Sequence, residues 1–338
     1  MKYAEKISLA HLPTPVQPLP RWYDTLGVRL TVKRDDLTGS HLSGNKIRKL
    51  EYLLREAVDL GATHVITTGG IQSNHCRATA LAAASLGMEP VLLLRTPRGL
   101  QGDLPSTPTG NVLLFHVAGA TIHTCDPHTY RTSRTERMAE LAAAIRADGG
   151  NPYVVDEGGS NALGTLGYVE AAKELLDQLD APPDTVVVPT GSGGTLAGLA
   201  LGFKALGVAT KAVGIAVCDD ADYFEAIVLR IAEEAAARFG LPTLTRDDFT
   251  ILEGFQGIGY AKTTPEEMRF LTDVARKDGL VLDPVYTNKA LRGLYHTLRD
   301  SPGCFGEDVV FVHTGGVFGL MAAGDSVTGL ATSGVSRL

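Results

Sequence analysis

Three cations lie close together in the sequence LSGNKIRKLEYLL (residues 42–54): Lys46, Arg48 and Lys49. The segment otherwise predicts a helix start, because Asn45 is a good N-cap residue and apolar residues follow at helical spacing. Cations at the positive end of a helix dipole cost about 0.3 to 1 kcal/mol each. The segment is therefore either a solvated basic face, or a site where a bound anion or a lysine without a free ammonium group offsets that cost.

A glycine-rich turn follows a β-rich run and consists of Gly191, Ser192, Gly193, Gly194 and Thr195. Glycines let the backbone approach a ligand closely, and N–H groups at the start of the next helix complement an anion. The turn lacks the lysine of a Walker A loop, and Leu196 replaces the third glycine of a dinucleotide fingerprint. A phosphate on a small cofactor fits it better than a nucleotide triphosphate, and the alternative is a tight turn without a ligand.

A second candidate anion site is the sequence GGIQSN (69–74). Its Ser73 and Asn74 bring side-chain donors next to backbone N–H groups, and such a set can bind the two oxygens of a carboxylate. Plain helix capping is the alternative. His75 follows directly and either touches a ligand, moves protons, or is simply packed in the core.

Two tyrosines stand in loop-like surroundings, Tyr260 in FQGIGYAK and Tyr286 in DPVYTNKA. A phenol there can act as a positioned acid or base or hold a substrate group, although many tyrosines are structural. The acidic pair in KRDD (33–36) is interpreted as pairing with its neighbouring cations, and we assign no metal site.

The elements that must position these residues alternate along the chain. Short β-rich runs lead through glycine-rich turns into Ala/Leu-rich helices, with the runs at 64–68, 88–94, 185–190 and 308–313. This alternation predicts an α/β fold with parallel sheets and helices on both faces. Ligands of such sheets bind beyond the C-terminal strand ends, so the glycine turns should face one crevice.

Two segments predict extended or irregular structure. The Pro-, Gly- and Ser-rich segment 96–111 is interpreted as a loop that could act as a lid, and 11–21 as an extended proline-rich arm.

Length and composition narrow the class of protein. The 338 residues carry a net charge of −7 without a basic block, which argues against nucleic-acid binding. The N-terminal sequence lacks the apolar core of a signal peptide, and no apolar run is long enough to span a bilayer. The four cysteines are scattered without zinc-ligand spacing, so we expect free thiols and a cytoplasmic protein that does not bind membranes.

A lysine at an unusual helix start, a phosphate turn and a carboxylate turn in one crevice together suggest pyridoxal phosphate. This cofactor needs a lysine for its Schiff base and a helix N-terminus for its phosphate, and its amino-acid substrate brings a carboxylate. Imine formation would remove the free ammonium group of Lys46, and the phosphate would attract Lys49.

Five segments, in order along nearly the whole chain, resemble the D-cysteine desulfhydrase / 1-aminocyclopropane-1-carboxylate (ACC) deaminase family: LSGNKIRKLEYLL, TTGGIQSNHCRATA, PTGSGGTLAGL, DPVYTNKALRGL and VHTGGVFGL. The resemblance implies the type II pyridoxal-phosphate fold, which is like that of the tryptophan synthase β subunit. It has two three-layer αβα domains with mostly parallel sheets. It also implies a small domain at 62–156, a large domain formed by 1–61 and 157–338, and a homodimer.

The resemblance assigns roles to individual residues. Lys46 matches the Schiff-base lysine, Lys49 a lysine that contacts the phosphate, and residues 191–195 the phosphate loop. Ser73 and Asn74 match residues that bind the substrate carboxylate and the phenolic oxygen of the cofactor. Gln72 and His75 flank them as substrate-binding candidates. Tyr260 and Tyr286 match the two active-site tyrosines.

Thr287 departs from the deaminase pattern, in which a glutamate faces the pyridine nitrogen of the cofactor. A carboxylate there keeps the nitrogen protonated and the ring a strong electron sink, whereas a hydroxyl does so less. Opening a cyclopropane needs that strength, but expelling a good leaving group from Cβ does not. The QSNH sequence around His75 also differs from the QSNQ typical of deaminases.

We therefore expect β-elimination from a small amino acid, most simply from D-cysteine to pyruvate, hydrogen sulfide and ammonia. The freed amine of Lys46 would remove the Cα proton, and the tyrosines would orient the substrate or assist the leaving group. L-Cysteate sulfo-lyase and ACC deaminase are the alternatives within the class. A phosphometabolite-binding protein without catalysis is the alternative outside it.

Overall fold

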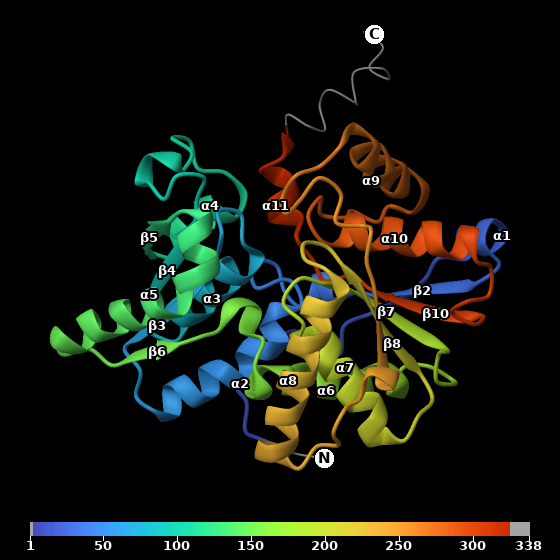
Figure 1. The fold of residues 1–338 in the computed structure, drawn as a ribbon, viewed down its shortest axis with the longest axis horizontal. Helices are drawn as coiled ribbons and strands as arrows, with labels where there is room; N and C mark the ends of the chain where they lie inside the picture. Colours follow the sequence, from blue (N-terminus) through green and yellow to red (C-terminus); the bar gives the residue numbers. More distant parts are fainter. Residues whose placement is uncertain (1–2, 325–338) are drawn as a thin grey trace, which may run out of the picture.

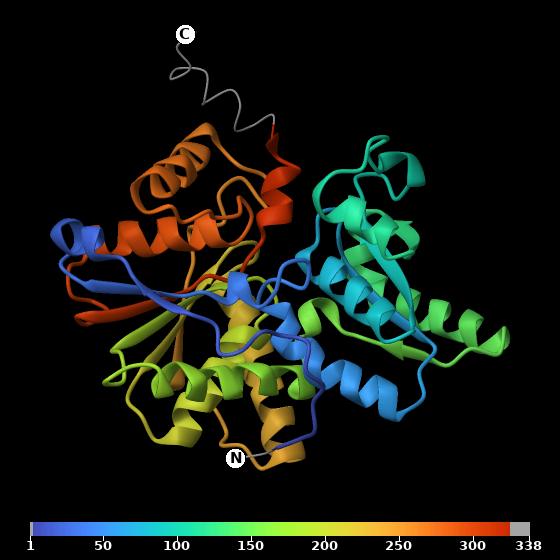
Figure 2. The same cartoon turned by 180° about the vertical axis from the view of Figure 1, so that it is seen from behind.

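The strands of the computed structural model, which describes residues 3–324, form two sheets (Figures 1 and 2). The first has six strands in the order β1 (Val16–Pro18), β2 (Arg29–Lys33), β10 (Asp308–Val312), β7 (Thr185–Thr190), β8 (Lys211–Ala216) and β9 (Phe249–Leu252). The second has four, in the order β5 (Thr121–Cys125), β4 (Glu89–Arg95), β3 (His64–Gly70) and β6 (Pro152–Val154). Every pairing is parallel except that of β1 with β2.

Helices cover both faces of each sheet (Figures 1 and 2). They are α1 (Tyr23–Leu26), α2 (Lys46–Asp59), α3 (Asn74–Ser85), α4 (Gly110–Val117), α5 (Pro127–Ala147), α6 (Ala162–Asp177), α7 (Gly194–Leu206), α8 (Ala221–Phe239), α9 (Pro265–Asp278), α10 (Thr287–Asp300) and α11 (Val317–Met321). Single 3-10 turns are η1 (Pro20–Trp22), η2 (Asp35–Leu37), η3 (Gln101–Asp103), η4 (Glu157–Gly159) and η5 (Arg246–Asp248). The expected α/β fold with parallel sheets is confirmed.

The two faces of each sheet are buried in different cores, which explains why the strands read as continuous apolar runs. Along β4, Val91 and Leu93 pack against α5, whereas Leu92 and Leu94 pack on the side of α3 and α4. The strands of the larger sheet divide in the same way, with α10 on one face and α6, α7 and α8 on the other. Alternate residues therefore hold helices on opposite sides of one strand.

Helix α2 lies between the two sheets and shares a core with both. Its Ile47, Leu50 and Leu54 are fully buried in one cluster with Val65 of β3 and Leu166 of α6. Since Lys46 is the first residue of α2, this packing fixes the position of its backbone relative to both sheets.

The four strands of the second sheet all lie between residues 64 and 154, inside the range expected for the small domain. The division at 62 and 156 stays a proposal. The large domain was expected to run to residue 338, and its last part, 325–338, lies outside the described residues.

The two irregular segments contain short elements. In 11–21, residues 16–18 form the edge strand β1, where prolines are tolerated because one side of the strand has no ladder partner. In 96–111, η3 is held by Asp103, whose carboxylate accepts hydrogen bonds from Thr96 Oγ1 (2.9 Å) and the Arg98 backbone (2.7 Å). No residue of 96–111 lines the cavity described below.

Candidate active site

A cavity of about 540 Å³ opens between the two sheets. The turns after β3, β7 and β10 all contribute to its wall, as the glycine-turn pattern predicts. Ten of the expected site residues line it: Lys46, Ser73, Asn74, His75, Gly191, Ser192, Gly193, Thr195, Tyr260 and Tyr286. The other four, Gln72, Lys49, Gly194 and Thr287, lie behind this wall.

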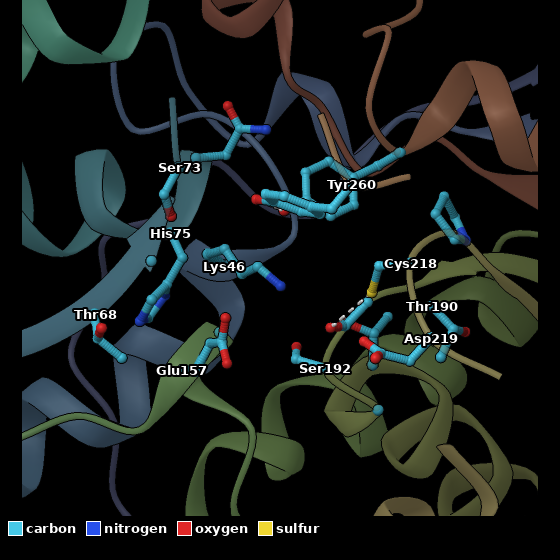
Figure 3. Close-up of a pocket in the computed structure, with 18 of the residues that line it drawn as sticks. Lys46, Thr68, Ser73, His75, Glu157, Thr190, Ser192, Cys218, Asp219 and Tyr260 are labelled. Atoms are coloured by element: carbon cyan, nitrogen blue, oxygen red, sulfur yellow. Dashed lines mark hydrogen bonds between the residues drawn. The ribbon is translucent and has the colours of Figure 1, made fainter. Parts of the chain in front are cut away.

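Lys46 extends from the first turn of α2 into the cavity (Figure 3). In this view Tyr260 lies above its side chain and Glu157 below it. Burial disfavours the ammonium form and lowers the pKa of Lys46 to about 8, although the Glu157 carboxylate acts in the opposite direction. A lysine with this pKa is partly neutral near physiological pH, as a nucleophile or a base must be.

The other two cations of α2 have different environments. Arg48 is buried and pairs with Asp35 (Nη2–Oδ1 2.8 Å) and Glu174 (Nη2–Oε1 2.8 Å), away from the cavity. Lys49 has no carboxylate partner among residues 3–324 and donates to Gly158 O (3.3 Å) and Ser160 Oγ (3.1 Å). Burial and the neighbouring Lys46 lower the pKa of Lys49 well below its usual value. The solvated basic face is therefore excluded for this segment.

The helix start also differs from expectation at Asn45. Its side chain makes no capping hydrogen bond to α2 and instead donates to Thr195 Oγ1 (3.0 Å). This contact joins the start of α2 to the glycine-rich turn after β7.

The glycine-rich turn 191–195 packs closely against η4. Ser192 Oγ lies 2.8 Å from Ser160 Oγ, which in turn accepts from Lys49, so a chain of polar groups leads from Lys49 to the turn. A Cβ atom on Gly194 would lie 2.7 Å from Ser160 Oγ, and one on Gly158 would lie 2.3 Å from Ser192 Oγ. Glycine is thus required for packing at both positions as well as for an open anion site.

Ser73 caps α3, because its Oγ accepts from the backbone N–H of Cys76 (3.1 Å). The adjacent turn is held by Asn111 at the start of α4, whose Nδ2 donates to Gln72 O (2.9 Å) and Asn74 Oδ1 (2.9 Å). The Gln72 side chain accepts from the Asn111 backbone (2.8 Å), so it braces the turn from outside the cavity.

His75 is buried and its state can be assigned from its neighbours. Thr67 Oγ1 donates to Val155 O (2.8 Å), so His75 Nε2, 2.8 Å from that hydroxyl, carries the proton and donates to it. Its Nδ1 is then an acceptor, and it has no hydrogen-bond partner among the described residues. Burial, with the charges of Lys46 and Lys49, holds the pKa of His75 well below its usual value and keeps the ring neutral.

Tyr260 and Tyr286 form one unit, because their hydroxyl oxygens lie 2.7 Å apart and their rings meet edge to face. Each ring packs on a glycine. A Cβ on Gly70 would lie 3.1 Å from Tyr260 Cε1, and one on Gly191 would lie 3.0 Å from Tyr286 Cε1. Burial raises the pKa of Tyr260 to about 12, against the lowering effects of its hydrogen bond to Tyr286 and of the Arg95 charge. Both phenols are therefore protonated at neutral pH.

Thr287 is fully buried at the start of α10, and its hydroxyl is engaged by Asp283. The Thr287 Oγ1 atom lies 2.7 Å from Asp283 Oδ1 and accepts from the Asp283 backbone N–H (2.7 Å). Burial raises the pKa of Asp283, while four donors from residues 285–287 oppose that rise. The contact of Thr287 with a pyridine nitrogen stays a prediction.

The cavity wall contains charged and aromatic residues that sequence reasoning missed. Glu157 accepts from Tyr130 Oη (2.6 Å) and lies 3.6 Å from Arg134 Nε. Arg95 and Arg131 also line the cavity. Position at a strand end was an available signal for Arg95, the last residue of β4. No motif marked the residues of α5.

The donor groups of this cavity fit pyridoxal phosphate. Two lysines, the half-buried Lys46 and the fully buried Lys49, lack a carboxylate partner within ion-pair distance among the residues described. The turn 191–195 offers hydroxyls and the N-terminus of α7 to an anion. Lys46 would hold the aldehyde carbon and the turn the phosphate, and a second anion site at Ser73 stays free for an amino acid.

Comparison with known proteins agrees with this chemistry. Residues 7–315 match the family described as pyridoxal-phosphate dependent enzymes. The chain therefore belongs to this family, and within it to the group of D-cysteine desulfhydrases and ACC deaminases. The expectations of family, type II fold, pyridoxal phosphate and an enzyme are confirmed.

Three relatives show how close the likeness is. The chain is 42% identical to a bifunctional D-cysteine desulfhydrase/ACC deaminase of Arabidopsis thaliana over 96% of this chain and 81% of that protein. It is 39% identical to a D-cysteine desulfhydrase of Klebsiella pneumoniae, with 94% and 95% covered. A crystal structure described as an ACC deaminase homologue superposes with a TM-score of 0.88 at 37% identity, covering 97% and 96% of the two chains.

Membrane-spanning helices and clustered metal ligands are absent from residues 3–324. None of the helices in this range is long and apolar enough to cross a membrane. The same residues contain no group of three or more His, Cys, Asp or Glu side chains that could hold a metal ion. The cysteines in this range are free, and burial raises the pKa of Cys76 to about 12, so its thiol is not activated.

Proposed function

We propose that the protein catalyses β-elimination from D-cysteine, giving pyruvate, hydrogen sulfide and ammonia. The observation that carries the proposal is the half-buried Lys46, with its pKa lowered to about 8, in one cavity with the hydrogen-bonded pair Tyr260 and Tyr286. A base for the Cα proton and neutral phenols for a leaving thiolate are the groups that this reaction needs. The name of the Klebsiella pneumoniae relative supports the choice of substrate.

The residues would act as follows. The side chains of Ser73 and Asn74 would bind the substrate carboxylate, next to the N-terminus of α3. Lys46 Nζ would take the Cα proton, and pyridoxal phosphate, when bound, would supply the electron sink that the reaction needs. One of the two neutral phenols would donate a hydrogen bond to the sulfur and stabilise its developing charge as the Cβ–S bond breaks.

The arrangement of the two tyrosines favours this order of events. Their hydroxyl groups are 2.7 Å apart and joined by a hydrogen bond. Since the pKa of Tyr260 is raised to about 12, its hydroxyl keeps its proton and can donate a hydrogen bond to the departing sulfur without becoming charged. Thr287, the residue after Tyr286, has a neutral side chain. A neutral group at this position suits elimination of a good leaving group from Cβ better than it suits the opening of a cyclopropane ring.

The test is an assay of purified protein loaded with pyridoxal phosphate. D-Cysteine, L-cysteine, L-cysteate and ACC are supplied separately, and pyruvate, 2-oxobutyrate, sulfide and sulfite are measured. We expect pyruvate and sulfide from D-cysteine, with activity lost in Lys46→Ala. Pyruvate and sulfite formed from L-cysteate alone would mean that L-cysteate, and not D-cysteine, is the substrate. Formation of 2-oxobutyrate from ACC would refute the argument that Thr287 disfavours cyclopropane opening. If the protein binds pyridoxal phosphate but turns over none of these compounds, the remaining hypothesis is a phosphometabolite-binding protein without catalysis.

The same proposal includes a homodimer located in the cytoplasm, as expected from the sequence. Light scattering coupled to size-exclusion chromatography gives the mass of the assembly, and a mass of one chain would exclude the dimer.

A further inference from the structure

Arg95 is the last residue of β4, at the C-terminal edge of the second sheet, where it lines the cavity. Its guanidinium carbon lies 4.6 Å from the centre of the Tyr260 ring and 5.1 Å from that of the Tyr130 ring. The two aromatic rings fix the plane of the guanidinium group without using its N–H donors. The charge is therefore held next to the tyrosine pair.

Arg95 differs from the other arginines of the cavity wall in having no carboxylate partner. Arg134 lies 3.6 Å from Glu157, and Arg131 lies 3.8 Å from Asp219. The side chain of Arg95 makes neither an ion pair nor a hydrogen bond with any residue of the described range, 3–324; its side-chain contacts are with the two aromatic rings. A half-buried guanidinium group with five free donors on a cavity wall is a receptor for an anion.

The other anions of the site have donors of their own. The phosphate of the cofactor is assigned to the turn after β7, which belongs to the other sheet. The substrate carboxylate is assigned to Ser73 and Asn74, after β3. Arg95 instead stacks on Tyr260, the residue assigned to the leaving group at Cβ.

We propose that Arg95 is a specificity-determining residue that binds an anionic substituent on Cβ of the substrate, such as a sulfonate or a carboxylate. The proposal rests on the β-elimination proposed above and extends its substrate class to acidic β-substituted amino acids. For a sulfonate, Lys46 takes the Cα proton, the Cβ–S bond breaks and sulfite leaves with the electron pair. The remaining aminoacrylate takes up water and gives pyruvate and ammonium, so that no oxidant or reductant is consumed.

The kinetic test compares charged with uncharged substituents on Cβ in the holoenzyme. Both enantiomers of cysteate and of β-chloroalanine are assayed for pyruvate with wild type, Arg95→Gln and Arg95→Lys. We expect Arg95→Gln to raise KM for cysteate by about 10- to 100-fold, as loss of a charge-assisted hydrogen bond does. For β-chloroalanine kcat/KM should change little, and Arg95→Lys should restore part of the cysteate affinity.

Arg131→Gln is the matched control, because Arg131 lines the same cavity but is paired with Asp219 and largely exposed. Arg131→Gln should leave the ratio of kcat/KM for cysteate to kcat/KM for β-chloroalanine unchanged. Equal losses for cysteate and β-chloroalanine in Arg95→Gln would overturn the proposal, since they would mean that Arg95 only positions Tyr260.

A binding measurement separates this inference from the proposed reaction. Calorimetry of the holoenzyme compares 3-sulfopropanoate with butanoate, in which a methyl group replaces the sulfonate; neither has an amino group to react. Tighter binding of 3-sulfopropanoate, lost in Arg95→Gln, supports the anion site even if no amino acid is turned over. Equal binding of the two compounds to wild type refutes it.

Discussion

At the scale of single residues, the chemistry depends on how burial changes the protonation of Lys46. Burial lowers its pKa to about 8, while Glu157 raises it. In the proposed reaction, this depressed value would make a neutral amine available for the aldehyde of the cofactor and later for the Cα proton. Glu157 is therefore expected to set the pH at which the amine becomes free.

The first prediction concerns the pH dependence of cofactor uptake. The initial rate at which apoprotein gains visible absorbance on addition of pyridoxal phosphate should rise with pH through a midpoint near 8, the pKa of Lys46. In Glu157→Gln the midpoint should move to lower pH, because the carboxylate that stabilises the ammonium form is gone. Asp219→Asn removes a carboxylate from the same cavity wall and should leave the midpoint unchanged. A midpoint that moves upward in Glu157→Gln contradicts the prediction.

Residues that start or end an element could be identified from the sequence, but their contacts could not. Lys46 and Ser73 stand beside helix-start and glycine-turn patterns, and both line the cavity. Arg95 and Glu157 acquire their roles only when β4 and η4 meet residues far away in the chain. Thr287 carried a sequence argument, yet its hydroxyl is engaged by Asp283, four residues earlier, which no motif indicated.

At the scale of elements, turns are held by residues outside the cavity. Asn111, at the start of α4, is fully buried and holds the turn that carries Ser73. Its Oδ1 also accepts from Nε of Arg77 (3.0 Å), a buried cation whose other donors reach the carbonyls of His41 and Ser43, just before Lys46. The helices α3 and α4 are thereby joined to the loop that leads into α2.

The second prediction is that Asn111→Ala weakens substrate binding, although Asn111 does not line the cavity. Loss of the amide leaves Arg77 Nε and Asn74 Oδ1 without partners, at a cost in unfolding free energy of about 1–3 kcal/mol. The loosened turn should raise KM for the amino acid by about 10-fold, as misplaced binding groups do. Steady-state kinetics and urea unfolding measure the two effects.

Asn151→Ala provides the comparison for Asn111→Ala. Asn151 donates to the carbonyls of Leu60 (2.8 Å) and Gly61 (3.1 Å) and does not line the cavity. It should lower stability without changing KM. If KM stays at its wild-type value in Asn111→Ala, the turn does not depend on α4.

The elements themselves were largely predictable, because buried parallel strands read as apolar runs between turns. The strand expected at 185–190 is β7, residue for residue. The segment 96–111 was expected to have no regular structure, yet it contains η3, which depends on the side-chain hydrogen bonds of Asp103 rather than on an apolar period.

At the scale of the whole molecule, α2 lies between the two sheets, and a set of charges behind it joins this helix to the side of the larger sheet. Arg48 bonds both carboxylates, Asp35 and Glu174, and Lys33 Nζ lies 2.5 Å from Glu174 Oε1. Tyr168 donates to Asp35 as well. This ion cluster (Lys33, Asp35, Arg48 and Glu174) connects β2, η2, α2 and α6 of the larger lobe.

The third prediction is that Arg48→Met lowers the unfolding free energy by about 3–5 kcal/mol at pH 7, since the buried Asp35 and the half-buried Glu174 lose the guanidinium group that they share. The pKa values of Asp35 and Glu174 are lowered in the folded protein, so their contribution is complete above the unfolded values near 4 and is lost below them. The difference from wild type should therefore shrink as pH falls below about 4. Urea unfolding at pH 7 and pH 3.5 measures it.

Arg55→Met gives the background for that measurement, because Arg55 lies on the same helix in an exposed pair with Asp59. It should cost less than about 1 kcal/mol. A similar loss in both variants would mean that burial adds nothing to the ion cluster.

Heat should act differently on this ion cluster than on the apolar cores around it. The hydration of charged groups becomes less favourable as temperature rises, so the cost of keeping Lys33, Asp35 and Arg48 away from water falls on warming. Their mutual attraction is retained over the same range. The contacts that the ion cluster makes between β2, α2 and α6 should accordingly be more stable in warm than in cold solution. Cooling, rather than warming, should weaken the packing of α2, the helix that begins with Lys46.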